Sequence, residues 1–182
     1  IIESEKIMDE YEQLSPNYCS CQVEDFNCDG KPEVILDTKK ATFFFSPKNG
    51  GTIFELDYKS KSFNCMNTLS RREEAYHENL FREDISHKID EEGHKSIHEL
   101  VKVKEKGLEN FLIYDSYIKS SMREHFLPLN ISVEALRNND YVEWWSLCDG
   151  FYEFQQNNNR LQFDGCGTVN IGDLKWNVKV SK

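Results

Sequence analysis

Apolar positions recur with two different periods along this chain of 182 residues. In the first 14 residues Ile7, Met8, Tyr11 and Leu14 fall on one face at helical spacing, and Glu and Lys occupy much of the rest. From Glu33 onward, short apolar runs and alternation between apolar and polar positions take over, and that pattern is typical of β-strands. The chain is therefore predicted to have a short N-terminal helix followed by a mainly β region.

The strongest strand patterns surround one tight turn. Residues 34–36 and 42–45 are apolar runs, residues 49–51 read Asn-Gly-Gly, and residues 52–58 alternate through Phe, Leu and Tyr. An Asn-Gly-Gly sequence between strand-like runs favours a hairpin turn, because glycine adopts positive φ without strain. These residues predict strands on both sides of a turn.

Later patterns are weaker. Residues 78–95 are polar and predict a surface loop or a short helix, whereas residues 97–106 and 112–117 predict strands. Residues 174–180 alternate Leu, Trp, Val and Val with polar residues and predict a strand with one buried face. Many short strands separated by turns favour an antiparallel β-sandwich. We expect residues 1–18 to be a helical lead-in from an upstream region, and residues 19–182 to be a β-sandwich domain that is incomplete at its C-terminal end.

Composition narrows the class of partner. The net charge is −10, with no dense basic patch, which disfavours nucleic-acid binding, and no apolar run is long enough to span a membrane. The six cysteines contain no Cys-x-x-Cys pair, so a structural zinc ribbon is not expected. In a chain of this length without a signal peptide we expect reduced thiols and a cytoplasmic location.

One loop has the spacing of a cation site. Asp25, Asn27, Asp29 and Glu33 place oxygen ligands at alternate positions around Gly30, an arrangement that can converge on Ca²⁺. The twelfth position of this loop is a leucine rather than a bidentate glutamate, so an EF-hand is excluded. The alternative is an acidic turn whose side chains bond only to their own backbone, and the pattern alone leaves both interpretations open.

A second candidate site is a charged cluster made of Arg71, Arg72, Glu73, Tyr76 and His77. Guanidinium, carboxylate and imidazole groups can bind sugar hydroxyls, and a Glu/His pair can transfer protons. The alternative is an ion-paired surface, because charge runs are usually solvated.

The remaining histidines and tryptophans have two interpretations each. His94 and His98 have a spacing that binds metals on a helix, but their segment favours a strand, and His125 is expected to be a packed structural residue. Trp144 and Trp145 could stack on sugar rings or fill the core.

Several ordered segments together resemble one family. These segments are residues 25–34, 50–58, 67–77, 96–105, 112–117 and 125–127. Together they resemble the C-terminal β-sandwich domain of the α-amylase/4-α-glucanotransferases of glycoside hydrolase family 57.

The resemblance implies a sandwich of the galactose-mutarotase-like kind that follows a catalytic barrel and a helical region. The barrel of such enzymes carries the catalytic carboxylates, so the resemblance implies no catalytic residue here. It implies instead a non-catalytic module that packs on the barrel and helps shape a cleft for an α-glucan or maltooligosaccharide. In that setting the loop at residues 25–33 would hold a structural Ca²⁺, and the charged cluster would face the barrel or the glucan. Two alternatives are an aldose epimerase-like enzyme and a free-standing glucan-binding module.

Overall fold

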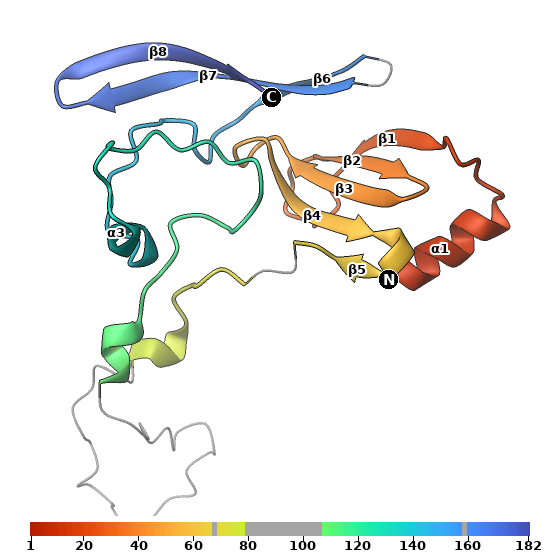
Figure 1. Cartoon of the computed structure of the whole chain (residues 1–182), viewed down its shortest axis with the longest axis horizontal. Helices are drawn as coiled ribbons and strands as arrows, with labels where there is room; N and C mark the ends of the chain where they lie inside the picture. The colour runs from red at the N-terminus through yellow and green to blue at the C-terminus, as the bar shows by residue number, and fades with distance from the viewer. Residues whose placement is uncertain (67–68, 79–106, 158–159) are drawn as a thin grey trace, which may run out of the picture. The chain divides into compact units, whose positions relative to one another are not determined.

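The computed structural model describes residues 1–66, 69–78, 107–157 and 160–182 (Figure 1). The expected strand at residues 97–106, the expected loop beyond residue 78, His94 and His98 lie outside the described residues. The helices are α1 (Ile2–Tyr11), η1 (Lys59–Lys61), η2 (Ala75–His77), η4 (Leu108–Phe111) and α3 (Val133–Arg137). The strands are β1 (Cys19–Glu24), β2 (Glu33–Thr38), β3 (Ala41–Ser46), β4 (Thr52–Tyr58), β5 (Phe63–Asn64), β6 (Glu153–Asn157), β7 (Arg160–Ile171) and β8 (Leu174–Ser181).

The chain folds as two compact units. One contains residues 1–69 and 117–182, and the other contains residues 70–116. The helix α1 and both sheets belong to the first unit, and the domain boundary expected after residue 18 stays a prediction. No helix among the described residues is long and apolar enough to cross a membrane.

Both sheets of the first unit are antiparallel meanders. The larger sheet has the order β1-β2-β3-β4-β5, and the smaller has the order β6-β7-β8. The turn between β3 and β4 uses Gly50 at φ 75° and Gly51 at φ 57°, as the Asn-Gly-Gly sequence predicts. The strands predicted around residues 34–36, 42–45 and 52–58 are thereby confirmed.

A shared core joins the two sheets. Val34, Phe45 and Ile53 from the larger sheet pack with Tyr152 and with Phe163 of β7. The rings of Phe45 and Phe163 lie 5.1 Å apart between centroids. Apolar faces of two antiparallel sheets buried against each other make a β-sandwich, so the predicted fold class is confirmed.

The helix α1 differs from the prediction in length and in burial. It ends at Tyr11, and Ile7, Met8 and Tyr11 of its apolar face are 64%, 54% and 82% exposed. Its buried residue is Asp9, whose carboxylate lies 2.8 Å from Lys59 Nζ. The helix therefore attaches to η1, which directly follows β4, through this ion pair and through the Lys6–Ser62 hydrogen bond, rather than through its apolar stripe.

Two predicted strands need correction. Residues 112–117 form no strand, because their backbone bonds within turns and to Arg71 instead of pairing with a neighbouring strand. The strand β8 exists, but Leu174 and Trp176 are 60% and 45% exposed, so its apolar face is not buried along its whole length. Only Val178 and Val180 of that face pack against the core, because the β7–β8 hairpin extends beyond it.

Candidate functional site

The loop at residues 25–33 is closed by its own side chains. The two carboxylate oxygens of Asp25 accept the backbone amides of Asp29 and Gly30, each at 2.9 Å. Asn27 Oδ1 accepts the same Asp29 amide at 2.9 Å, and Gly30 has φ 82°. These are the bonds of a local acidic turn, and each oxygen retains a lone pair that such a bond does not use.

Glu33 lies beneath this loop and is only 1% exposed. Its Oε2 accepts the amide of Phe26 at 3.1 Å. Burial raises the pKa of Glu33, and the charges of Asp29 and Asp25 raise it further. The ligand atoms of these three carboxylates, all within the described part of the chain, do not gather within 4.8 Å of one another. A cation here would have to draw them together.

The charged cluster divides into two parts. The backbone amide and Nε of Arg71 donate to Asp115 at 2.7 and 2.9 Å, so this guanidinium is already paired. His77 Nδ1 lies 3.2 Å from the amide of Glu74 and 3.0 Å from the Tyr114 hydroxyl. Arg71 and His77 are thus held in place within their own compact unit.

The other predicted members of the cluster are exposed. Arg72, Glu73 and Tyr76 have their side chains in solvent, and Tyr76 is 57% exposed. The structure leaves these three side chains available for contact, whereas a general base at His77 Nδ1 would first have to leave its present partners.

The two tryptophans have different environments. Trp145 is 3% exposed, its Nε1 donates to the Tyr152 hydroxyl at 3.2 Å, and its ring packs on Phe126 at 5.2 Å. Because of this burial Trp145 offers no face to a sugar and fills the core instead. Trp144 is partly exposed.

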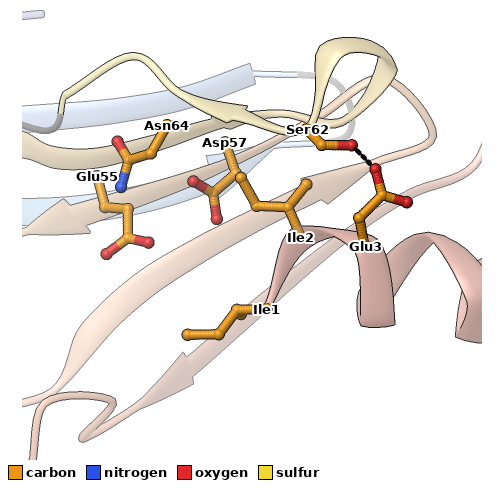
Figure 2. A pocket seen from close by; sticks show the side chains of 7 residues that line it. All are labelled: Ile1, Ile2, Glu3, Glu55, Asp57, Ser62 and Asn64. Carbon is orange, nitrogen blue, oxygen red and sulfur yellow. Dashed lines mark hydrogen bonds between the residues drawn. The ribbon is translucent and has the colours of Figure 1, made fainter.

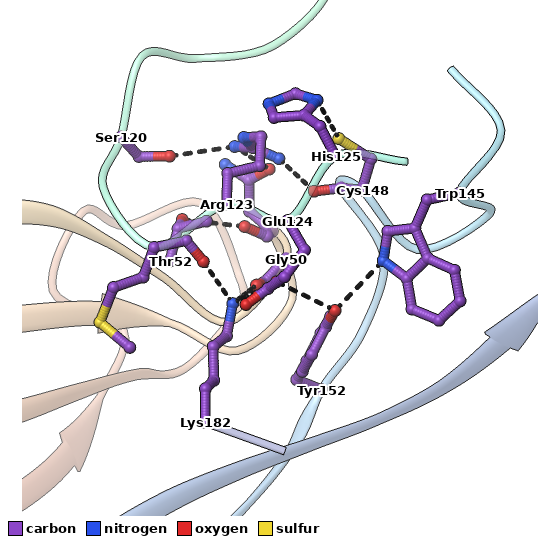
Figure 3. A network of polar contacts seen from close by, with 12 residues as sticks. Gly50, Thr52, Ser120, Arg123, Glu124, His125, Trp145, Cys148, Tyr152 and Lys182 are labelled. Atoms are coloured by element: carbon purple, nitrogen blue, oxygen red, sulfur yellow. Dashed lines mark hydrogen bonds and ion pairs between the residues drawn. The ribbon is translucent and has the colours of Figure 1, made fainter. Parts of the chain in front are cut away.

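A polar network lies where the two sheets meet, and Figure 3 shows it. We call it the sheet junction; its members are Gly50, Arg123, Glu124, Trp145, Tyr152 and Lys182. Lys182 Nζ donates to Gly50 O and Glu124 Oε2, both at 2.7 Å, and lies over the ring of Tyr152. Burial lowers the pKa of Lys182, and Glu124 opposes that effect. Burial also raises the pKa of Tyr152 to about 12.

Arg123 completes the sheet junction. Its guanidinium donates to Cys148 O at 2.5 Å, to Asn49 Oδ1 at 3.1 Å and to Ser120 Oγ at 3.1 Å. The amide of Gly50 donates to Gly150 O at 2.7 Å in the same region. These bonds join the β3–β4 turn to the segment that precedes β6.

Next to the junction, three side chains of metal-ligating type come together. His125 Nδ1 lies 2.6 Å from Glu143 Oε2 and 3.3 Å from Cys148 Sγ. The three ligand atoms all lie within 4.8 Å of one another. Burial raises the pKa of the Cys148 thiol to about 11. The sequence predicts a structural role for His125 and does not indicate this cluster, because its members are scattered over 24 positions without a recognisable spacing.

A separate pocket of about 310 Å³ lies between the start of α1 and the β4–β5 edge (Figure 2). Glu55 and Asp57 of β4 line it together with Asn64, Ile1 and Ile2. Burial raises the pKa of both carboxyl groups. Asp57 Oδ1 has no hydrogen-bond partner among the residues that the structure describes.

The fold and these sites together define an antiparallel β-sandwich module whose polar groups chiefly support its architecture. Residues 25–182 match the family model described as "Alpha-amylase/4-alpha-glucanotransferase, C-terminal". The chain therefore belongs to this family of C-terminal domains.

Individual relatives agree with this assignment. The chain is similar to an α-amylase of Dictyoglomus thermophilum, 36% identical over 76% of this chain and 20% of that protein. It is also similar to a 4-α-glucanotransferase of Thermococcus kodakarensis, 33% identical over 81% of this chain and 22% of the relative. In these alignments it spans about a fifth of the relatives' length.

A solved structure shows the same fold. The crystal structure of the 4-α-glucanotransferase of Thermococcus litoralis superposes with a TM-score of 0.74, at 24% identity. The superposition covers 96% of this chain and 25% of that one.

Proposed function

We propose that the chain is a non-catalytic module of an α-glucan-acting enzyme of glycoside hydrolase family 57, either an α-amylase or a 4-α-glucanotransferase. The observation that carries the proposal is the family match over residues 25–182, together with relatives of which the aligned part is only about a fifth. In this proposal the catalytic carboxylates lie in another part of the parent protein. The module would pack on the catalytic domain and help shape the glucan cleft.

Exposed apolar side chains support a packing role. Ile7, Met8 and Tyr11 form an uncovered stripe on α1, and Leu129 and Val133 are 105% and 75% exposed in and before α3. Apolar stripes on helices normally pack against another element. We assign the stripe of α1 to contact with the remainder of the parent polypeptide, because that remainder is the largest partner the proposal supplies.

The proposal predicts different behaviour for the isolated chain and for the parent protein, and measurements on both test it. The purified chain should release no products from maltooligosaccharides, and deletion of residues 25–182 from the parent should lower its glucan-processing activity and its melting temperature. A double variant Ile7→Ser/Met8→Ser should destabilise the parent more than it destabilises the isolated chain, with Glu10→Ser on the exposed polar side as the matched control. Hydrolysis or transfer by the purified chain would refute the non-catalytic role.

Glucan contact is assigned to the exposed members of the charged cluster and to Trp144. Arg72, Glu73 and Tyr76 have exposed side chains, and hydroxyl-rich ligands bind to such mixed charged and aromatic surfaces. Retention of the parent on amylose should fall in Tyr76→Ala and stay unchanged in Phe111→Ala, an even more exposed aromatic of the same compact unit.

A structural Ca²⁺ at Asp25, Asn27, Asp29 and Glu33 is part of the proposal. The residues fit the ion in two respects: the loop offers oxygen ligands only, and Glu33 is a buried carboxylate whose pKa is raised beside two further carboxylates. A divalent cation would offset that repulsion. Excess Ca²⁺ should raise the melting temperature of chelator-treated protein, and Asp29→Asn should reduce the increase while Asp173→Asn, in the exposed β7–β8 turn, should not. An unchanged melting temperature would remove calcium from the proposal.

A further inference from the structure

Three side chains beside the sheet junction have no role in the proposed function. His125, Glu143 and Cys148 place an imidazole nitrogen, a carboxylate oxygen and a sulfur within 4.8 Å of one another. This set of donors is unlike the oxygen-only loop at residues 25–33. Imidazole and thiolate together favour Zn²⁺ and related transition metals over Ca²⁺.

The cluster is built on paired backbone segments. Glu143 Oε1 accepts the amides of Phe126 and Trp145 at 2.9 and 3.0 Å, which directs Oε2 toward His125. The amide of Trp144 donates to Phe126 O at 3.0 Å, so the segments that carry His125 and Glu143 lie side by side. The carboxylate orientation is therefore fixed by the backbone before any ion binds.

The third ligand is fixed as well. Cys148 is 2% exposed, and its carbonyl accepts a hydrogen bond from Arg123. Figure 3 shows its sulfur directed at the ring nitrogen of His125. An aromatic ring also contacts the imidazole: the Tyr117 ring lies 5.8 Å from that of His125 between centroids.

We propose that His125 Nδ1, Glu143 Oε2 and Cys148 Sγ bind one zinc-type transition-metal ion, with the fourth position open to water. Tetrahedral Zn²⁺ with ordinary bond lengths sets such ligand atoms roughly 3.4–3.6 Å apart. The Cys148–His125 separation of 3.3 Å is close to this value, and the His125–Glu143 separation of 2.6 Å has to widen.

The side chain of His125 allows both the widening of its distance to Glu143 and the entry of an ion. Its side chain is 33% exposed, whereas that of Glu143 is 11% exposed, so the imidazole can shift at little packing cost and an ion can enter from its side. On binding, the thiol proton of Cys148 passes to solvent. The carboxylate and the thiolate then balance the two positive charges of the ion.

Co²⁺ is the probe for this site, because thiolate coordination gives it a near-ultraviolet charge-transfer band. Chelator-treated, reduced protein should bind one equivalent of Co²⁺ with this band, and added Zn²⁺ should abolish it while excess Ca²⁺ should not. Cys148→Ser should abolish the band, and His125→Asn and Glu143→Gln should each weaken binding at least about tenfold. Glu143→Gln keeps the oxygen that accepts the two amides. Cys166→Ser, which changes an exposed cysteine, is the matched control and should bind Co²⁺ like the unaltered protein.

Circular dichroism and melting temperature establish that each variant is folded. Because Cys148 is buried, Cys148→Ser could fail to fold. In that case Co²⁺ binding by His125→Asn tests the proposal, since the side chain of His125 is partly in solvent. The proposal is overturned if the unaltered protein shows no thiolate charge-transfer band. It is equally overturned if folded His125→Asn and Glu143→Gln bind Co²⁺ as tightly as the Cys166→Ser control, since the three side chains would then be a hydrogen-bonded group only.

Discussion

The sheet junction and the loop at residues 25–33 are both rich in polar groups, yet they use them differently. In the junction, Lys182 and Arg123 each bond to backbone carbonyls and side chains from distant segments. In the loop, Asp25 and Asn27 bond to amides at most five residues away. Long-range bonds hold the two sheets together, whereas short-range bonds only shape a turn, so mutations in the two regions should differ in their effect on unfolding.

The largest expected effect is at the junction tryptophan. Trp145→Ala removes a fully packed ring and its bond to Tyr152, and should lower the free energy of unfolding by about 3–5 kcal/mol. Trp176→Ala, on the exposed part of β8, should cost less than about 1 kcal/mol. Chemical denaturation of the two variants measures the difference. Equal unfolding midpoints would show that the junction does not stabilise the sandwich as described.

A smaller effect is expected at the turn glycine. In Gly50→Ala the new Cβ would lie 2.5 Å from Cys148 O, in addition to the strain of a positive φ. Gly172→Ala has a similar φ but nothing within 4 Å, so it measures the conformational cost alone, about 1 kcal/mol. Thermal melting should show Gly50→Ala to be clearly less stable than Gly172→Ala. The same loss in both would mean that the close approach to Cys148 is relieved without cost.

The smallest effect is expected in the loop, and it depends on pH. The folded-state pKa of Glu33 is raised, so the folded protein holds this proton to higher pH than the unfolded chain does. The contribution of Glu33 to stability is therefore lost as pH rises from the ordinary carboxyl value of 4.5 through the raised one. In calcium-free buffer Glu33→Gln should flatten that part of the stability profile, and Glu134→Gln, exposed on α3, should not. If Glu33→Gln leaves the dependence of stability on pH unchanged, the pKa of Glu33 is not raised in the folded protein.

Much of the fold could be predicted because local patterns and packing agree there. The runs that became β3 and β4 lie on the two sides of the Asn-Gly-Gly turn and each contains buried residues, and the sequence around them predicts both strands and the turn. Residues 112–117 contain similar apolar and aromatic residues but pair with no strand among the residues that the structure describes, and composition alone does not reveal that. The alternation of apolar and polar residues correctly predicts that β8 is a strand. How far the β7–β8 hairpin extends beyond the core depends on tertiary packing, which a local pattern does not encode.

The two candidate metal sites also differ in whether local sequence or tertiary packing brings their residues together. The spacing of the acidic loop is visible in the sequence because its members are close together. The His125, Glu143 and Cys148 group could not be predicted, because Glu143 and Cys148 reach the histidine only when their segment pairs with β7, through bonds such as Ser146 to Thr168. The one available sequence signal was a histidine that follows a glutamate and precedes an apolar run, and it favoured ordinary packing.

The contact between Lys182 and Gly50 has a consequence for the order of folding. These residues are 132 positions apart, so the bond closes one of the longest loops in the chain. The β1–β5 sheet contains only neighbouring pairings and can form while later residues are still being synthesised. The junction, by contrast, cannot close until residue 182 has left the ribosome, and until then Gly50 O and Glu124 lack the ammonium group that joins them in the finished fold.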